Sequence, residues 1–510
     1  MTFGALLRGS LLYTIGSVVP RIGVFLLLPI YTLGMGPADF GVFSLMLSLA
    51  GLLTILYRLG LDGALLRFHF DVGSRRTAAL YWTMAAITLA AGLVLSVVIG
   101  TVAAPIFSTV FAGVALVPYG WLAIAIALLT AFQYVPTTWF RAVEKPGRVV
   151  VFGFLTFGAG AVVTLWLVLG LHLGAVGGLL GQLASGIVVV AVTIALLRRR
   201  RPIGFDRDLA EEGLGFGLPL VPHSIAGWVL NLSDRWVIGL TLVGLAAVQV
   251  QRAIGIYSLG YQLGQVVAVV AIALNTAWVP FFYLRGEHER GPDLLREMTT
   301  LSVGALAILT AFVGVLAPEV VAVLAPRSWG ADVSVAAAVT PLVAMACLAQ
   351  GFYFMVVSPI FLQRRTALLP VFTLAAGALN VGLNILVIPI IGVVGAGWST
   401  IAGYVALCAG TLWYAGRGYP LRFDAPRLAA LIGIVAGAIV VARLLTPEGL
   451  IRAGLVHIAI GLVAAGLIAF VAARPWGRAR FLVSATAPLV PASAPAPASV
   501  PVPPGRPAGS

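Results

Sequence analysis

Two arginines at matching positions of long apolar segments are the residues best suited by type to do chemistry. Arg21 and Arg235 lie 214 positions apart. The same offset relates Phe40–Leu45 to Ile254–Leu259, which read FGVFSL and IGIYSL and share their glycine, serine and leucine. A guanidinium group binds phosphate through paired hydrogen bonds. Two such groups inside apolar segments therefore predict contact with an anionic ligand.

The depth of Arg21 supports this interpretation if the segments cross a membrane. Arg21 follows Arg8 by about 13 residues, or about 20 Å along a helix, too far for its side chain to reach the same surface. An arginine near the bilayer centre costs at least about 2.5 kcal/mol, so it needs a wet cavity or a partner. The alternative is a structural ion pair between helices.

Asp234 and Asn231 accompany Arg235 in the second apolar segment. Adjacent residues of a helix point about 100° apart, so Asp234 and Arg235 need not pair with each other. Asp234 could bind a proton or Na⁺, or it could hold an arginine from another helix. Asn231 lies one turn earlier on the same segment.

The remaining candidates each have two interpretations. Arg58 and Asp62 are four residues apart, a spacing that allows a pair on one helix face. They either line a cavity or anchor and cap a helix at the interface. Arg252 begins a segment, where an interface anchor and a gate contact are the two roles. His223 follows Pro222 and is either a hydrogen-bonded structural residue or a site of proton coupling.

The composition assigns the chain to the membrane. Of 510 residues, 61% are apolar and only 9% are charged, which is too few charges to cover a soluble fold. The net charge of +14 comes from basic residues in short runs between apolar segments rather than on one face, so nucleic acid is not expected as a partner. Cys347 and Cys408 both fall in apolar segments, so no disulfide framework is expected.

Runs of about 20 apolar residues predict fourteen membrane-spanning helices. They fall near 8–33, 40–66, 78–103, 118–141, 149–170, 174–197, 213–242, 250–282, 297–318, 332–361, 366–388, 394–416, 428–446 and 453–473. The first is expected to be a retained helix rather than a cleaved signal.

Basic residues predict the orientation. Of the 31 lysines and arginines, 24 fall in the two ends or in the loops after even-numbered spans. By the positive-inside rule both termini are cytoplasmic, in a multi-pass protein of the inner membrane.

Internal repeats predict the domain organisation. Leu173–Gly178 and Ile391–Ala396 form a second matching pair, at an offset of 218. We therefore expect an all-α protein with two pseudo-symmetric six-helix lobes, 1–200 and 201–418, two extra helices in 419–483, and a disordered cytoplasmic tail rich in proline and alanine from 484 to 510. Many transporters are built this way, with the substrate path between the halves.

Enzymatic signatures are missing from the sequence. The sole lysine, Lys145, follows no glycine-rich loop, so ATP hydrolysis is not expected. The five histidines are scattered and no nucleophile elbow occurs, so we expect no catalytic residue, metal or cofactor. A membrane glycan polymerase or ligase would need carboxylates and a large outer loop.

Several motifs together resemble Wzx-like polysaccharide flippases of the multidrug/oligosaccharidyl-lipid/polysaccharide (MOP) exporter superfamily. The resemblance covers about residues 8–416 and rests on Leu28–Thr32, Gly36–Ser44, Leu59–Phe68, Phe216–Pro222, Ser233–Arg235 and Gly255–Leu259.

This resemblance implies flipping of an undecaprenyl-pyrophosphate-linked oligosaccharide between leaflets, by alternating access and coupled to a cation gradient or the membrane potential. Arg21, Arg58, Arg235 and Arg252 would be the cations of the cavity. A polysaccharide polymerase and glycosyltransferases would be partners. A lipid II flippase is the second interpretation, and a multidrug exporter, which usually needs acidic cavity residues, is the third.

Overall fold

The computed structural model describes residues 23, 25–199, 204–286, 291–330 and 333–473. These residues form helices and connecting turns, with no strand among them. The described helices belong to one compact unit that extends to Ala472. The all-α class predicted from the sequence is confirmed, whereas the tail from 484 to 510 lies outside the described residues.

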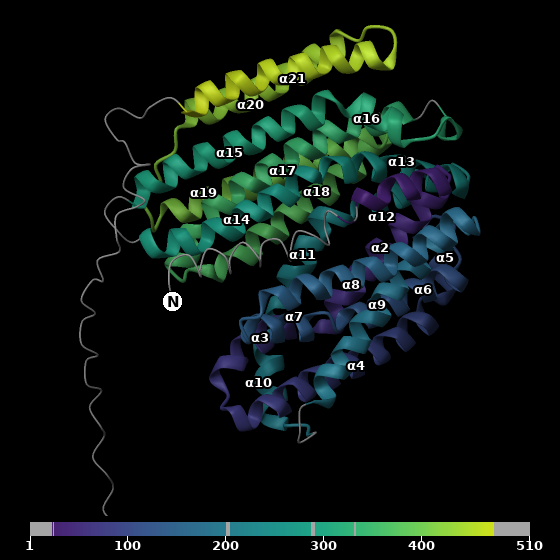
Figure 1. The fold of residues 1–510 in the computed structure, drawn as a ribbon, viewed down its shortest axis with the longest axis vertical. Coiled ribbons are helices and arrows are strands. Elements are labelled where there is room, and N and C mark those ends of the chain that lie inside the picture. Colours follow the sequence, from purple (N-terminus) through teal and green to yellow (C-terminus); the bar gives the residue numbers. More distant parts are fainter. Residues whose placement is uncertain (1–22, 24, 200–203, 287–290, 331–332, 474–510) are drawn as a thin grey trace, which may run out of the picture. The chain divides into compact units, whose positions relative to one another are not determined.

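We divide the described helices by sequence into the N-terminal half, up to Arg199, and the C-terminal half, from 204 to 473. The N-terminal half contains the helix Phe25–Gly34, α2 (Pro37–Arg58), α3 (Leu61–Asp71), α4 (Ser74–Val102), η1 (Ala104–Ile106), α5 (Phe107–Val110), η2 (Leu116–Gly120), α6 (Trp121–Ala131), α7 (Tyr134–Ala142), α8 (Pro146–Thr164), η3 (Leu165–Gly170) and α9 (Gly174–Arg198). The C-terminal half contains α10 (Arg207–Gly217), η4 (Leu218–Leu220), α11 (Val221–Leu232), α12 (Asp234–Thr241), α13 (Ala247–Gly264), α14 (Val266–Arg285), α15 (Gly291–Val315), α16 (Ala317–Leu324), η5 (Arg327–Trp329), α17 (Val333–Leu362), η6 (Thr366–Leu368), α18 (Leu369–Ile391), α19 (Val394–Gly416), α20 (Ala425–Leu444) and α21 (Leu450–Ala473). In Figure 1, α10 of the C-terminal half lies beside α3 and α4 of the N-terminal half.

Twelve helical segments among the described residues are long and apolar enough to cross a membrane. They correspond to twelve of the fourteen predicted spans. The predicted first span lies mostly outside the described residues, which contain only its apolar end, Phe25–Gly34. The predicted twelfth span is α19, a helix of 23 residues that is not among the twelve. A count of fourteen therefore stays a prediction.

Small residues allow the helices to approach one another closely, as the glycine run of α9 predicts. A Cβ atom added to Gly181 would lie 1.9 Å from Thr164 Oγ1 of α8, and one added to Gly178 would lie 2.6 Å from Met35 Cε. In the C-terminal half α17 packs against α13, α15 and α19, and a Cβ atom on Gly397 would lie 2.9 Å from the Leu342 side chain. These glycines are therefore packing residues.

One correction concerns the second predicted span, which is not a single helix. Leu59 and Gly60 adopt left-handed backbone angles, with φ of 49° and 72°, and separate α2 from α3. A Cβ atom on Gly60 would lie 2.2 Å from the Gly217 carbonyl oxygen, so only glycine fits against α10. The prediction that Arg58 and Asp62 share one helix face is wrong, because this break interrupts the i,i+4 relation.

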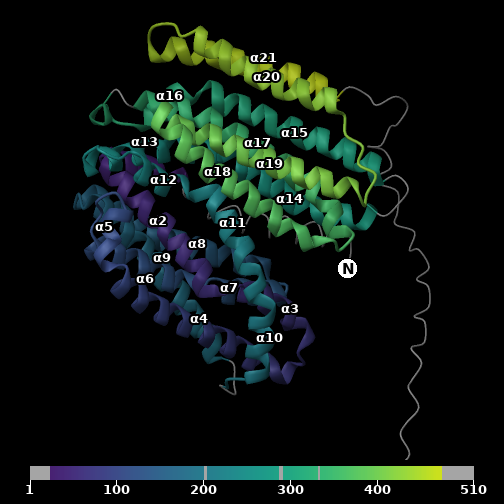
Figure 2. The ribbon, with the colours of Figure 1, turned by 180° about the vertical axis from the view of Figure 1, so that it is seen from behind.

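The seventh predicted span is also interrupted, here as its prolines indicate. The 3₁₀ turn η4 separates α10 from α11, so α10 packs on α3 and α4 while α11 packs on α18. The Arg76 guanidinium binds the Asp206 carboxylate at 2.6 Å, and this contact lowers the pKa of Asp206. The first part of the span is thus held by the N-terminal half, as the two views in Figures 1 and 2 show.

Candidate functional site

A buried carboxylate is the centre of the most polar part of the helical interior. Asp234 begins α12 and is 0% exposed. Its carboxylate accepts hydrogen bonds from the Tyr257 hydroxyl, from Asn384 Nδ2 at 2.7 Å and from Thr400 Oγ1 at 3.3 Å. These donors lie on α13, α18 and α19, so four helices meet at one carboxyl group.

The donors compensate the cost of burying Asp234. An unpaired carboxylate is expensive to remove from water, whereas several hydrogen bonds to its oxygens offset that cost. Not every polar atom nearby is satisfied, since Asn384 Oδ1 and Asn380 Nδ2 are buried without a hydrogen-bond partner. Such atoms are rare in folded proteins and often mark a functional site or an unoccupied ligand position.

The chemistry of this cluster suits a proton or a small cation. The carboxylate, two side-chain amides and a hydroxyl supply oxygen atoms, and Asn384 Nδ2 also lies 3.3 Å from Asn380 Oδ1. Rotation of the Asn384 amide would exchange its nitrogen for its oxygen and turn a donor to Asp234 into a cation ligand. The same groups would also hold a protonated Asp234 with little rearrangement.

Arg235 does not pair with its neighbour. Its guanidinium carbon lies 4.4 Å from the ring centroid of Tyr261 and 5.8 Å from that of Tyr257. Nη1 donates to the Asn231 carbonyl at 3.3 Å, and the residue is 4% exposed. The two adjacent side chains point in different directions, as the 100° helical step predicts, although Tyr257 contacts both. The rings of Tyr257 and Tyr261 cover the cation through cation–π contact.

Asn231 connects this cluster to two more helices. Its Oδ1 accepts a hydrogen bond from the Tyr404 hydroxyl at 2.9 Å, and Tyr404 in turn accepts one from Gln350 Nε2 at 2.9 Å. Asn231 itself lies on α11, Gln350 on α17 and Tyr404 on α19. We name Asp234, Arg235, Asn231 and their tyrosine, threonine and asparagine partners the polar cluster: Tyr257, Tyr261, Asn380, Asn384, Thr400 and Tyr404.

Arg58 lies in the other half and has a different environment. Nε donates to the Ala131 carbonyl at 3.0 Å and Nη2 donates to the Thr130 carbonyl at 2.8 Å. These carbonyls lie at the C-terminal end of α6. The last carbonyls of a helix have no partner within the helix and need other donors. Asp62 is exposed on the first turn of α3. Arg58 therefore stabilises the junction between α6 and α7.

The other predicted candidates lie apart from the polar cluster. Arg252 lies on α13, and its Nη2 donates to the carbonyl of Trp329. His223 lies near the start of α11, and its Nδ1 is buried without a hydrogen-bond partner. Arg21 lies outside the described residues, so the predicted pairing of Arg21 with Arg235 stays a prediction.

Sequence reasoning missed most partners of Asp234. Tyr257 belongs to the repeated hexapeptide, where Phe43 is its counterpart and nothing in the pattern indicates a role for its hydroxyl. Asn380 and Asn384 are four residues apart in an otherwise apolar helix, and that spacing is a signal that could have placed them on one face. Thr400 gives no such signal, because threonines are frequent in the described helices and satisfy themselves on their own backbone, as Thr400 also does.

Solved structures identify the class of protein to which this fold belongs. The chain is similar to the lipid II flippase MurJ in an inward closed conformation, with a TM-score of 0.69, 12% identity, and 90% of this chain and 98% of that chain covered. It is also similar to a multidrug resistance MATE family transporter of the MOP superfamily in an inward-facing conformation, with a TM-score of 0.56, 18% identity, and 83% and 96% covered. The fold is that of MOP superfamily transporters.

The sequence identifies the family more narrowly. Residues 6–283, more than half of the chain, match the family described as polysaccharide biosynthesis protein, and the chain belongs to this family. A Haemophilus influenzae relative, described as Lsg locus putative protein 1, is 24% identical over 290 residues, which cover 54% of this chain and 65% of that protein. The resemblance to Wzx-like members of the MOP superfamily is confirmed.

Proposed function

We propose that this protein is a flippase that moves an undecaprenyl-pyrophosphate-linked oligosaccharide from the cytoplasmic to the outer leaflet of the inner membrane. The proposal is carried by the combination of two findings: the sequence belongs to the polysaccharide biosynthesis protein family, and the fold is similar to that of a lipid flippase. In this proposal both termini are cytoplasmic, glycosyltransferases supply the lipid-linked glycan, and a polymerase uses it after transport.

The proposal assigns the pyrophosphate of the carrier lipid to the intramembrane arginines. Arg235 and Arg21 would share the anion, with Arg58 and Arg252 adding positive potential along the path. In the described conformation Tyr261 lies over the Arg235 guanidinium, so the ligand would reach Arg235 when this ring turns aside. Arg58 would act mainly through its charge, because Nε and Nη2 are bonded to carbonyls.

The polar cluster is the proposed coupling site. Asp234 would alternate between an ionised form that holds a cation and a neutral or cation-free form, and Tyr257 and Asn384 would adjust with it. Because α12, α13, α18 and α19 all contact this carboxyl group, a change in its charge changes the packing among four helices. His223 and Asp62 are weaker candidates for the same role.

A lipid II flippase is the second candidate function, favoured by the likeness to MurJ. Both substrates would present a pyrophosphate to the arginines and differ in the attached sugar and peptide. A multidrug exporter is less compatible with the buried cation Arg235, because a cationic drug would be repelled. A membrane glycan polymerase or ligase is the enzymatic alternative.

Purified protein in liposomes tests the proposal directly. Vesicles would contain a fluorescent undecaprenyl-pyrophosphate oligosaccharide, fluorescent lipid II or a fluorescent cationic drug, and a membrane-impermeant quencher would report the fraction in each leaflet. We expect protein-dependent movement of the oligosaccharide carrier and slower movement of lipid II. Movement of lipid II alone would establish the second function, and export of the drug alone the third.

Arginine variants in the same vesicles test the anion contact. We expect Arg235→Ala to abolish most movement, and Arg235→Lys to keep a part of it because the charge remains while the planar fork is lost. The exposed Arg452 on α21 provides a matched control, since Arg452→Ala also removes one positive charge. Full movement in Arg235→Ala, or a loss explained by lower protein abundance, would reject the contact.

A further inference from the structure

The two copies of the repeated hexapeptide lie against each other. Gly41 on α2 faces α13, where a Cβ atom would lie 1.9 Å from the Gln251 carbonyl oxygen. Gly255 on α13 faces α2, where a Cβ atom would lie 1.8 Å from the Pro37 carbonyl oxygen. The repeat offset of 214 places Pro37 on Gln251, so the two contacts are reciprocal. The helices therefore cross backbone to backbone at the pseudo-two-fold axis of the repeat.

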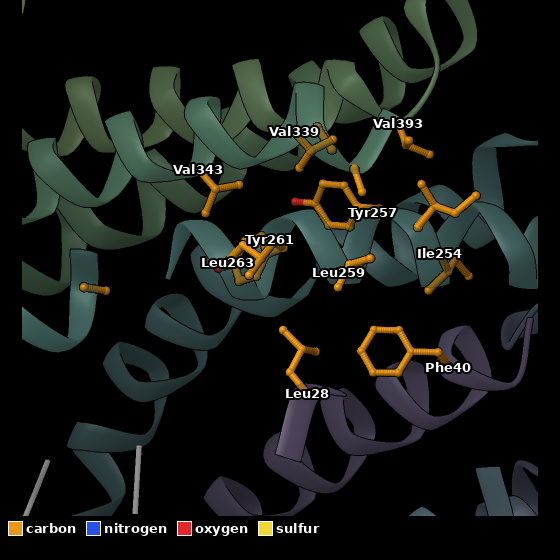
Figure 3. Packing of buried hydrophobic residues seen from close by; sticks show 14 of the residues in the cluster. Leu28, Phe40, Ile254, Tyr257, Leu259, Tyr261, Leu263, Val339, Val343 and Val393 are labelled. Atoms are coloured by element: carbon orange, nitrogen blue, oxygen red, sulfur yellow. The ribbon is translucent and has the colours of Figure 1, made fainter. Parts of the chain in front are cut away.

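Apolar side chains extend this crossing. Figure 3 shows Leu28 and Phe40 of the N-terminal half facing Ile254 and Leu259 on α13. All four side chains are 1% exposed or less. The end of the molecule at which α2 and α13 begin is thus closed by both backbone and side-chain contact. The charge distribution assigns this end to the extracytoplasmic side.

Each half also extends a loop onto the other half at this end. The loop after α5 presents the Ala112 carbonyl, which accepts a hydrogen bond from Gln251 Nε2 at 2.9 Å. In the C-terminal half, α16 ends at Leu324, whose carbonyl accepts one from Thr32 Oγ1 at 2.6 Å. The repeat offset places Ala112 on Pro326, two residues beyond Leu324, so the two bonds fall in corresponding segments, and each segment is bonded to the opposite half.

Three tryptophans of the C-terminal half complete the closure. Trp329 Nε1 donates to the carbonyls of Thr32 at 3.2 Å and of Met35 at 3.0 Å. Trp228 Nε1 donates to the Ser48 carbonyl at 2.9 Å, and Trp236 Nε1 donates to Ser48 Oγ at 2.7 Å. Every one of these indole N–H groups thus bonds to an acceptor in the N-terminal half.

We propose that these contacts form one extracytoplasmic seal, and that Trp329 is the residue whose withdrawal opens it. The seal consists of the Gly41–Gly255 crossing, the bond of Thr32 to Leu324 and the bonds of Trp228, Trp236 and Trp329. The inference rests on the proposed alternating access, because a flippase must separate these surfaces in each cycle.

Trp329 is suited to release because of where it lies. It ends the short 3₁₀ turn η5 rather than lying inside a long helix, and Gly330 follows it with a φ of 76°. Its acceptors are carbonyls at the end of the helix Phe25–Gly34, which water can satisfy once the indole leaves. Indole itself is well accommodated at a membrane surface, so both states keep their hydrogen bonds. Arg252 Nη2, bonded to the Trp329 carbonyl, positions the turn.

Spin labels on the two halves measure the opening without any substrate. Ile106 and Val243 lie at this end on opposite halves and are 56% and 87% exposed. Labels would replace both residues in full-length protein in nanodiscs, with the buried Cys347 and Cys408 changed to alanine. Trp329→Phe keeps a ring but removes the N–H group. We expect the ratio of long to short distances to rise roughly fivefold, as loss of about one net hydrogen bond predicts.

Two further variants make the test decisive. Thr32→Val removes the bond to Leu324 from the other side of the seal and should shift the distances in the same direction. Trp398→Phe, at an indole that is 55% exposed on α19, should leave them unchanged. Unchanged distances in both Trp329→Phe and Thr32→Val would overturn the seal, as would equal shifts in the Trp398→Phe control. Because no glycan is present, failure of the proposed substrate leaves this result unaffected.

Discussion

At the scale of single residues, Asp234 is the side chain whose environment is hardest to explain by stability alone. An apolar residue would fill its position without any desolvation cost, and the protein instead surrounds a carboxylate with Tyr257, Asn384 and Thr400. Removal of one hydrogen-bonding partner would leave buried polar atoms of the remaining residues without a partner, so the effects of substitutions in the cluster should not be additive. We therefore propose that Asp234 serves in binding a proton or cation rather than in stability.

Replacement of Asp234 by asparagine separates charge from shape. Asp234→Asn keeps the volume and part of the hydrogen bonding but removes the negative charge. We expect normal membrane insertion, and a loss of roughly tenfold in the response of flipping to an imposed Na⁺ or proton gradient, which corresponds to ~1.4 kcal/mol of coupling. The measurement is the initial flipping rate in liposomes with and without each gradient.

Asn275 provides the control for this prediction. Its Oδ1 is also buried without a partner, but it lies on α14, outside the polar cluster. Asn275→Ala should leave the gradient dependence intact. If Asp234→Asn responds to the gradients as the parent protein does, then Asp234 is a structural residue and coupling resides elsewhere.

At the scale of elements, one buried histidine joins the two C-terminal helices to α16. His457 on α21 is 0% exposed, and Nε2 lies 2.9 Å from the Ala442 carbonyl at the end of α20. Nδ1 lies 2.7 Å from Glu319 Oε1 on α16. Carbonyl oxygens only accept, so Nε2 carries a proton, and His457 and Glu319 share another. One side chain thus links α20 and α21 to the rest of the C-terminal half.

Loss of His457 should loosen this pair of helices. His457→Ala leaves Glu319 and the Ala442 carbonyl without their donor, at a cost of about 1–3 kcal/mol for each buried group. We expect a lower apparent midpoint of thermal unfolding in detergent and faster proteolysis between α19 and α20. Ile458→Ala, at a neighbouring side chain that is 43% exposed, is the control. Equal midpoints for the two variants would show that apolar packing holds these helices.

At the scale of the whole molecule, the orientation in the membrane decides which side the crossing of α2 and α13 faces. The 24 basic residues on one side predict cytoplasmic termini and place the crossing of α2 and α13 on the outer side. Reporter fusions after Arg201 and after Ser510 should both show cytoplasmic activity in cells. Extracytoplasmic activity at either site would invert the assignment of the seal or change the number of spans.

From the sequence alone, the membrane class, the all-α fold and nearly all helix positions could be predicted. They follow from local quantities: the length of apolar runs, the scarcity of charge and the breaks at proline. The repeat also predicted that Gly41 and Gly255 are equivalent. It could not predict that they touch, because equivalence under a two-fold axis does not say how close each copy lies to that axis.

The tertiary structure alone decided which polar groups meet. Asp234 and Thr400 are 166 residues apart, and Trp329 and Thr32 are 297 apart, so no periodicity connects either pair. It also decided that Arg58 and Asp62 lie on different helices. Leu59 and Gly60 turn the chain between α2 and α3, where Gly217 of α10 packs against Gly60. The apolar pattern determines whether a helix spans the membrane, because the side chains that face lipid must be apolar. Which helices pack together depends on small residues and buried hydrogen bonds, whose partners are distant in sequence.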